Sequence, residues 1–343
     1  MACPPTLQID YPRLADIAAH PAWWQDVLAL IRFDRGSPAA PLADITTAEV
    51  MTPVLGGADG ADGAAEVWRV AGPVHSGQRG RVRYRHNGRL LFASLSVPES
   101  EFHHGSAGGT ADALRAATEA GYREMFAALE SLGFPHPLRI WNFLPEINGA
   151  IGEGERYWHF NGARQQAFIG RRRAIRGDVP AASAVGAEPD SPVTIYCIAG
   201  QHSPIPLENP RQRSAWDYPP QYGPKSPTFA RACLESDGAR TLFISGTASI
   251  VGHETAHAGD ARAQTRETLR NIRALIDAAN ERIGDERHSL GQLRYKVYVR
   301  RAEHQPMIEQ ELRREVGAAA PVLYLQADIC RRDLLVEIEA VGP

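Results

Sequence analysis

Two side chains in one short segment have the chemistry to bind a carboxylate. Residues 138–168 begin with an apolar, aromatic run typical of a strand and continue into a polar stretch that contains Tyr157 and Arg164. These two residues are seven positions apart, or two helical turns, so they share a face if the segment is helical. A guanidinium donates two parallel charge-assisted hydrogen bonds to a carboxylate, and a phenol adds another donor. On these residues alone, a surface helix with a solvated arginine and a packed tyrosine is the more common structure.

A candidate strand near the C-terminus carries two candidate acids. Residues 334–341, LLVEIEAV, place Glu337 and Glu339 on the same face, because side chains two apart along a strand point the same way. Burial of a carboxyl group raises its pKa, and a general acid must be protonated to act. The spacing leaves open which of the two is the acid, and two solvated glutamates on an exposed face are the alternative.

Residues 253–257, HETAH, match the HExxH pattern of zinc proteases. Zinc binding by that pattern requires a helix that brings both imidazoles to one face, together with a third ligand. The segment directly follows a candidate strand and is flanked by Gly252 and Gly259, so we expect a connecting loop there. We predict no metal and no cofactor.

The composition describes an ordinary globular protein. The chain has 343 residues, which exceeds the usual size of a single core and favours two domains. A net charge of −3 gives no general attraction to nucleic acid or to anionic membranes. The four cysteines show no metal-binding or CxxC spacing, the N-terminus lacks a signal-peptide pattern, and no apolar run reaches the length of a membrane span. We therefore expect a cytoplasmic protein without a membrane segment.

The order of candidate elements repeats along the chain. The first half has a strand (89–97), a helix (110–132), a strand (138–144) and the helix with Tyr157 and Arg164, and small polar residues predict a loop at 56–65 and an interdomain linker at 177–192. We predict an α+β fold of mixed sheets with helices on one face, in two packed β-α-β domains at 1–190 and 191–343. The second half has strands at 241–250, 293–299, 321–329 and 334–341 and helices at 260–283 and 307–316.

At the residue level, the second half resembles the YjgF/RidA family. The matching pieces are FARA (229–232), SGTA (245–248), polar and apolar positions of the 260–283 helix, and the closing VEIEAV (336–341). The whole chain, including WNFLPEIN, GERYWHFNGAR and QADICRRDLLVEIEAV, more closely resembles the chorismatases. That family removes pyruvate from chorismate without a cofactor and is built from two YjgF-like halves. The resemblance therefore implies two YjgF/RidA-like domains and a small-molecule substrate.

The resemblance also implies roles for particular residues. The family's catalytic acid maps to Glu337 on the last strand. A glycine and a cysteine that accompany hydroxybenzoate formation, rather than a dihydroxycyclohexadienoate, map to Gly246 and Cys330. In the family, arginine and tyrosine side chains from both halves bind the two substrate carboxylates. The matching residues are Tyr157, Arg164, Tyr218 and Arg231.

The activity implied is that of a lyase that forms 3-hydroxybenzoate, with or without 4-hydroxybenzoate, and pyruvate. The implied assembly is a monomer or a homotrimer. One alternative is a YjgF-type enamine or imine deaminase, but the arginine which that group carries at the start of the penultimate strand is missing from residues 321–324. The other alternative is a non-catalytic module that binds an aromatic acid.

Overall fold

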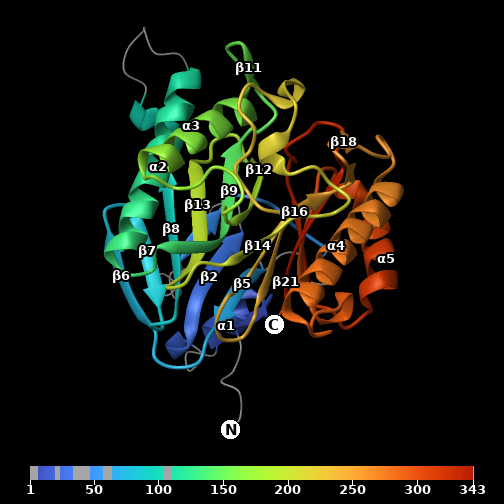
Figure 1. Cartoon of the computed structure of the whole chain (residues 1–343), viewed down its shortest axis with the longest axis horizontal. Helices are drawn as coiled ribbons and strands as arrows, with labels where there is room; N and C mark the ends of the chain where they lie inside the picture. The colour runs from blue at the N-terminus through green and yellow to red at the C-terminus, as the bar shows by residue number, and fades with distance from the viewer. Residues whose placement is uncertain (1–6, 20–23, 34–46, 57–63, 103–109, 343) are drawn as a thin grey trace.

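The chain folds around two mixed β-sheets, each with helices on its outer face (Figure 1). Strands and helices alternate in both halves, so the predicted α+β class is confirmed. The structure is a computed structural model, and it describes residues 7–19, 24–33, 47–56, 64–102 and 110–342.

The first-half sheet has the strand order β12-β9-β13-β8-β7-β6. Helices α2 (Thr110–Ser131) and α3 (Arg156–Gly170) cover one face, where Leu114, Phe126 and Phe160 join the apolar core beneath them. The strands are β6 (His75–Arg79), β7 (Val82–His86), β8 (Leu90–Val97), β9 (His136–Pro145), β12 (Ala181–Ala187) and β13 (Val193–Gly200).

The second-half sheet has the order β14-β15-β16-β21-β19-β20-β4, with helices α4 (Ala261–Ile283) and α5 (Gln305–Val316) on one face. Helix α4 begins where the Asp260 side chain accepts a hydrogen bond from the backbone N–H of Ala263, and it ends at Gly284 in the left-handed conformation. The strands are β4 (Val54–Leu55), β14 (Ile205–Leu207), β15 (Ala232–Leu234), β16 (Leu242–Ala248), β19 (Arg294–Val299), β20 (Val322–Gln326) and β21 (Val336–Gly342).

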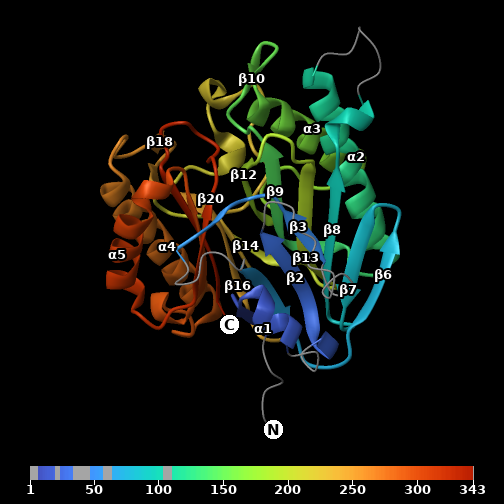
Figure 2. The same ribbon diagram turned by 180° about the vertical axis from the view of Figure 1, so that it is seen from behind.

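A third sheet, in the order β1-β5-β2-β3, lies behind both halves (Figure 2). Trp68 on β5 stacks on Phe243 of the second-half sheet, with 6.3 Å between ring centroids, and lies 6.2 Å from Phe92 of the first-half sheet. The sequence analysis predicted no element here. The longest strand of this sheet has the sequence VLALIRF, and the period of such a short continuous apolar run does not distinguish a strand from a buried helix. The elements are β1 (Gln8–Asp10), α1 (Leu14–Ala19), β2 (Val27–Phe33), β3 (Ala48–Val50) and β5 (Ala65–Arg69).

The internal repeat is longer than the sequence indicated. Elements β8-α2-β9-α3-β12-β13 correspond in order to β16-α4-β19-α5-β20-β21, and each copy contains one parallel strand pair, β9 with β12 and β19 with β20. The prediction of a linker at 177–192 was wrong, because residues 181–187 of that segment form strand β12, which pairs with β9 in the first-half sheet. Its sequence, AASAVGA, consists of small residues and gives no apolar period.

The boundary expected between residues 190 and 191 falls inside one sheet, since the next strand, β13, pairs with β8 and β9 of the first half. The loop expected at 56–65 lies largely outside the described residues, and its last residue, Ala65, begins β5.

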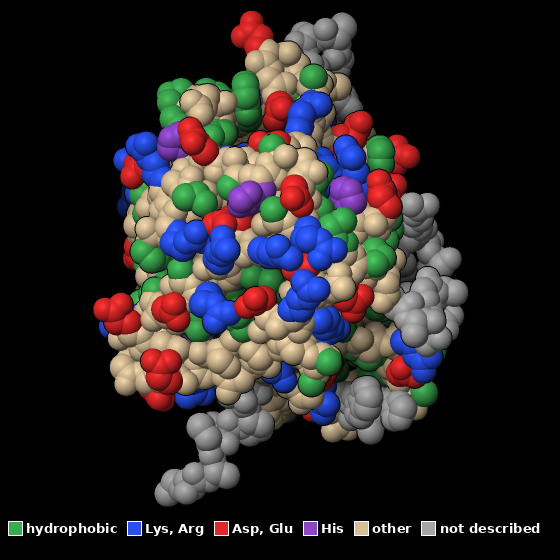
Figure 3. Space-filling view, turned by 90° about the vertical axis from the view of Figure 1, so that its right-hand side faces the viewer, with side chains coloured by type: hydrophobic (Ala, Val, Ile, Leu, Met, Phe, Trp, Pro, Cys, Tyr) green, Lys and Arg blue, Asp and Glu red, His purple; other side chains and the backbone are tan. Residues whose placement is uncertain are grey.

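The outer face of α4 and α5 is strongly charged, and basic side chains form a band across it (Figure 3). Glu311 of α5, for example, forms ion pairs with three arginines, Arg262, Arg266 and Arg314. Such exposed networks are typical of a solvated helix face. Within the described part of the chain, no helix is both long and apolar enough to span a membrane.

Candidate active site

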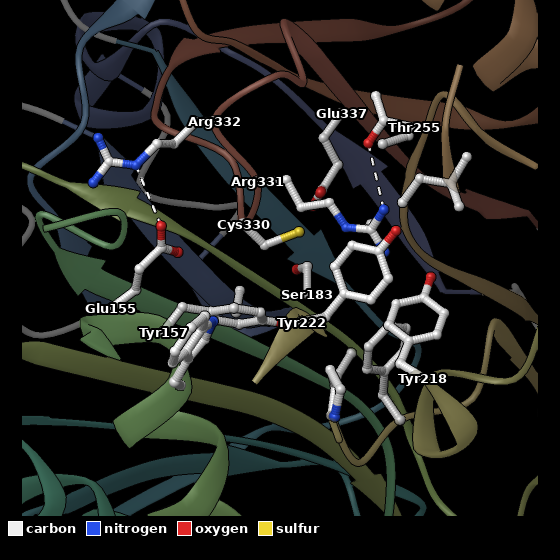
Figure 4. A pocket seen from close by; sticks show the side chains of 18 of the residues that line it. Glu155, Tyr157, Ser183, Tyr218, Tyr222, Thr255, Cys330, Arg331, Arg332 and Glu337 are labelled. Carbon is white, nitrogen blue, oxygen red and sulfur yellow. Dashed lines mark hydrogen bonds and ion pairs between the residues drawn. The ribbon is translucent and has the colours of Figure 1, made fainter. Parts of the chain in front are cut away.

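A cavity of about 360 Å³ lies between the two halves of the chain (Figure 4). Helix α3 and strand β12 line it from the first half, and β16, β21 and the β20–β21 connection line it from the second. All seven site residues of the sequence analysis lie on this cavity, so one bound molecule could touch all of them. They are Tyr157, Arg164, Tyr218, Arg231, Gly246, Cys330 and Glu337.

Strand β21 presents Glu337 and Glu339 to the side of the sheet that faces away from α4, while Ile338 between them packs into the core under that helix. Their cross-strand neighbours on β19 differ, because Tyr298 lies opposite Glu337 and Lys296 lies opposite Glu339. One strand face therefore gives its two carboxyl groups different surroundings.

Four donors surround the carboxylate of Glu339. Lys296 Nζ lies 2.9 Å and Trp141 Nε1 lies 2.6 Å from Oε1, while Arg139 Nη2 at 2.7 Å and Ser183 Oγ at 3.1 Å contact Oε2. Burial alone would raise the pKa of Glu339, but the charges of Lys296 and Arg139 lower it below its ordinary value. Glu339 is therefore ionised at neutral pH and is a poor proton donor.

Glu337 has the opposite electrostatics. Its side chain lines the cavity although the residue is only 4% exposed. Burial, reinforced by the negative charge of Glu339, raises the pKa of Glu337 to about 8. The direction of the shift and its first cause, burial, agree with the sequence analysis, although the neighbouring Val336 and Ile338 face the other side of the sheet and do not surround the carboxyl group. Glu337 is protonated at neutral pH.

Gly246 makes room for the carboxyl group of Glu337. The register between β16 and β21 shifts at Ser245 and Gly246, which forms a β-bulge beside the cavity. A Cβ atom on Gly246 would overlap Oε1 of Glu337 and would lie 2.9 Å from Cβ of Ser183. Any larger residue at this position must therefore displace the carboxyl group of Glu337.

Arg164 reaches the cavity from α3 and is 1% exposed. One guanidinium nitrogen, Nη2, donates to Oδ1 of Asn161 at 3.2 Å, and Nε is buried without a hydrogen-bond partner. Tyr157, two turns earlier on the same helix, also lines the cavity, as the predicted helical spacing requires. An unpaired buried donor of this kind costs about 1–3 kcal/mol, which an anionic ligand would recover.

Arg231 reaches the cavity from the second half. Its Nη2 donates to the hydroxyl of Tyr218 at 2.7 Å and to the backbone carbonyl of Arg213 at 2.6 Å. Its Nε, like that of Arg164, is buried without a hydrogen-bond partner. Tyr218 follows a short 3-10 helix (Ala215–Asp217), which brings it to the cavity wall.

Cys330 lies in the connection between β20 and β21, beside Glu337 on the cavity wall. Burial, together with the nearby carboxyl group of Glu337, raises the pKa of the Cys330 thiol to about 12. The side chain is therefore a neutral, weakly polar thiol, which suits it to shaping the cavity rather than to nucleophilic attack.

Sequence reasoning did not select several polar residues of the cavity wall, three of which are Arg331, Tyr222 and Ser183. Arg331 follows Cys330 directly, Tyr222 is the second tyrosine of WDYPPQY, and Ser183 lies in β12, which had been expected to be a linker. Adjacency to the chosen residues was a usable signal for Arg331 and Tyr222. Ser183 offered no signal, because only the sheet pairing of β12 places it there.

The cavity lining carries excess positive charge. Four guanidinium groups face two carboxylates, Glu155 and Asp333, when Glu337 is protonated. One of the four, Arg332, forms an ion pair with Glu155 at 3.3 Å (Figure 4). The lining is therefore suited to an anion with two negative charges. The four arginines are Arg164, Arg231, Arg331 and Arg332.

The HETAH segment is a hairpin rather than a helix. It contains β18 (Glu254–Thr255), which pairs with β17 (Ile250–Val251), and it ends at His257 with a φ of 59°. The segment connects β16 to α4 without forming a helix, but it contains a short hairpin where a loop was expected. Among the described residues, no cluster of three or more His, Cys, Asp or Glu side chains has the arrangement of a metal site.

Comparisons with known proteins agree in one family. Residues 66–199 match the family model described as "Chorismatase FkbO/Hyg5-like, N-terminal". A 3-hydroxybenzoate synthase of Streptomyces hygroscopicus is 38% identical over 289 residues, 81% of each chain, and a chorismatase of Streptomyces rapamycinicus is 37% identical over 285 residues, also 81% of each chain. The crystal structure of a chorismatase superposes with a TM-score of 0.80 at 30% identity and covers 100% of both chains.

Proposed function

The chain belongs to the chorismatase family, and on that premise we propose that it is a lyase that converts chorismate to 3-hydroxybenzoate and pyruvate. The observation that carries the proposal is the buried carboxyl group of Glu337 in a cavity lined with arginines from both halves. The 38% identity to a 3-hydroxybenzoate synthase favours 3-hydroxybenzoate as the main aromatic product.

Chorismate carries two carboxylates, one on the ring and one on the enolpyruvyl group. Arg164 with Tyr157 would bind one carboxylate from the first half, and Arg231 with Tyr218 would bind the other from the second. Fixing both ends of the dianion orients the enol ether relative to the acid, and such orientation lowers a barrier by several kcal/mol.

Glu337 would donate its proton to the methylene carbon of the enol ether, which leaves an oxocarbenium-like group. The neighbouring ring hydroxyl oxygen then attacks the ring carbon that bears the ether, the carbon–oxygen bond breaks, and pyruvate departs. The proton that the hydroxyl loses returns the Glu337 carboxylate to its acid form. The resulting arene oxide opens and aromatises to hydroxybenzoate. The atoms of chorismate equal those of the two products, so this route consumes no water and no oxidant.

The experiment that tests the function is incubation of the pure protein with chorismate in the presence of a strong chelator. We expect stoichiometric pyruvate and 3-hydroxybenzoate, measured by a coupled pyruvate assay and by chromatography, with full activity after exhaustive dialysis. Activity lost on dialysis and restored by zinc would contradict the cofactor-independent mechanism. Turnover of an enamine or imine but not of chorismate would favour the deaminase, and binding without turnover would favour the non-catalytic module.

The rate should depend on pH through Glu337. The acid acts in its protonated form, and its raised pKa extends that form up to about pH 8, so activity is present below this value and is lost as pH rises through it. We expect kcat/KM to be nearly constant at neutral pH and to fall about tenfold per pH unit above about 8. A profile that already falls between pH 5 and 6 would contradict the assignment of the essential acid to a carboxyl group with a pKa of about 8.

The product ratio should depend on Cys330. A neutral thiol beside Glu337 would exclude water from the ring, which favours attack by the ring hydroxyl over hydrolysis to a dihydroxycyclohexadienoate. We expect Cys330→Ala to change the product distribution more than it changes pyruvate release, as measured by both assays on one sample. An unchanged product profile would exclude Cys330 as a determinant.

Gly246→Ala should differ from Cys330→Ala in its effect on pyruvate release. Because its new methyl group must displace the carboxyl group of Glu337, we expect pyruvate release to fall as well as the product profile to change.

We further propose that the protein is cytoplasmic and is a monomer or a homotrimer. Size-exclusion chromatography with light scattering distinguishes the two assemblies, and a stable dimer would contradict both.

A further inference from the structure

Arg331, which the sequence analysis did not select, has a guanidinium that is fixed in place but incompletely paired. Its Cζ lies 3.8 Å from the centroid of the Tyr222 ring, a stacked position. Nη1 donates to the backbone carbonyl of His253 at 2.8 Å and approaches Oγ1 of Thr255 at 3.4 Å. Nη2 is buried and has no hydrogen-bond partner. The HETAH hairpin thus holds one side of this arginine and leaves the other without an acceptor.

The backbone that carries Arg331 is also fixed. Arg300 donates from Nε to the carbonyl of Leu334 at 2.7 Å and from Nη2 to the carbonyls of Ile329 and Arg331 at 2.9 and 2.8 Å. One side chain therefore binds three carbonyl groups of the β20–β21 connection. Arg331 is preorganised before any ligand enters, which lowers the entropy cost of binding.

Arg331 and Arg231 lie against the same aromatic ring. Their Cζ atoms are 5.1 and 5.4 Å from the centroid of Tyr218. Figure 4 shows Arg331 extending from the β20–β21 connection toward Tyr222 and Tyr218, on the opposite side of the cavity from Tyr157. A carboxylate that reached both guanidinium groups would satisfy the unpaired Nη2 of Arg331 and the unpaired Nε of Arg231.

We propose that Arg331 is a substrate-binding residue that shares one substrate carboxylate with Arg231, while Arg164 binds the other. The inference rests on the proposed function, since it assumes that the ligand is the chorismate dianion. It assigns the substrate two guanidinium groups on the second-half side of the cavity and one on the first-half side. The HETAH hairpin and Arg300 then act as positioning elements for Arg331.

The first test compares Arg331→Met with Arg332→Met, which removes the same charge from the next residue. The Arg332 side chain is 64% exposed and pairs with Glu155 at the rim. With chorismate as substrate, we expect Arg331→Met to raise KM at least tenfold more than Arg332→Met does, with a smaller change in kcat. Arg331→Lys should restore only part of the loss, because an ammonium lacks the planar fork. Equal effects of the two methionine variants would overturn the inference.

The second test identifies the shared carboxylate from the two products, since pyruvate carries one carboxylate of the substrate and 3-hydroxybenzoate carries the other. Inhibition constants for both products are measured on the unchanged protein and on Arg331→Met, Arg231→Lys and Arg164→Lys. We expect the changes at 331 and 231 to weaken inhibition by the same product, and the change at 164 to weaken inhibition by the other. If Arg331→Met instead follows Arg164→Lys, or affects neither product, the inference is wrong.

These outcomes are separable from failure of the proposed function. An unchanged protein that releases no pyruvate from chorismate would overturn both proposals. A protein that is active and whose KM is insensitive to Arg331→Met would overturn only the assignment of Arg331. Circular dichroism and thermal unfolding of each variant establish that a raised KM does not reflect unfolding.

Discussion

Replacement of Glu337 by Gln is expected to lower kcat for pyruvate release by about 10²- to 10⁴-fold, the usual contribution of a general acid. Glutamine keeps the shape of a protonated carboxyl group but has no acidic proton to give to the enol methylene carbon. Binding of an unreactive dicarboxylate should therefore change by less than about tenfold. Steady-state kinetics and calorimetric titration measure the two quantities.

Glu339→Gln is the matched control, because the residue lies on the same strand face. It leaves the buried guanidinium of Arg139 without its carboxylate and leaves Lys296 with Glu66 as its one remaining acidic partner among the described residues, and breaking a buried pair costs about 3–5 kcal/mol. We expect this variant to lose thermal stability, whereas Glu337→Gln should unfold close to the temperature of the unchanged protein. If Glu337→Gln keeps a near-native kcat and a folded Glu339→Gln loses kcat, then Glu339 and not Glu337 is the general acid.

Arg164→Ala and Arg231→Ala should each lower kcat/KM roughly 30- to 4,000-fold. This range corresponds to a loss of about 2–5 kcal/mol of transition-state stabilisation. Both guanidinium groups are buried, at 1% and 5% exposure, so removal of either would leave a substrate carboxylate desolvated and without its partner. The loss should appear mainly in KM for chorismate.

Lysine variants at the same two positions provide the control, because they retain charge without the bidentate geometry, and we expect an intermediate loss. A loss below about tenfold in either alanine variant would show that the corresponding arginine does not contact the substrate.

The second-half fold was more accessible to sequence reasoning than the first. Helix α4 has Leu269, Ile272 and Leu275 at helical spacing and Asp260 as its N-terminal cap. The sequence therefore indicated both the helix and the residue at which it begins. Strand β12 offers only small residues, and it is a strand because β9 pairs beside it. Its identity depends on tertiary structure that no local pattern encodes.

The site residues likewise divide into those that a sequence pattern identifies and those that only the tertiary structure identifies. The resemblance to a family located Glu337, but the period of a strand could not separate it from Glu339. The distinction depends on register, which sets Lys296 opposite one glutamate and Tyr298 opposite the other. Arg331 was missed for a related reason, because its partners His253 and Tyr222 come from loops that are distant in sequence.

Strand β4, at residues 54–55, closes the edge of the second-half sheet by pairing with β20, at residues 322–326. Glu66, near the start of the chain, likewise pairs with Lys296 on β19. A chain emerging from the ribosome therefore makes these early segments long before their partners exist. Such distant pairings require closure of very long loops, which slows folding. The cavity, too, is assembled only after β21, which carries Glu337, has been made, and early segments with unpaired edges are prone to aggregate in the meantime.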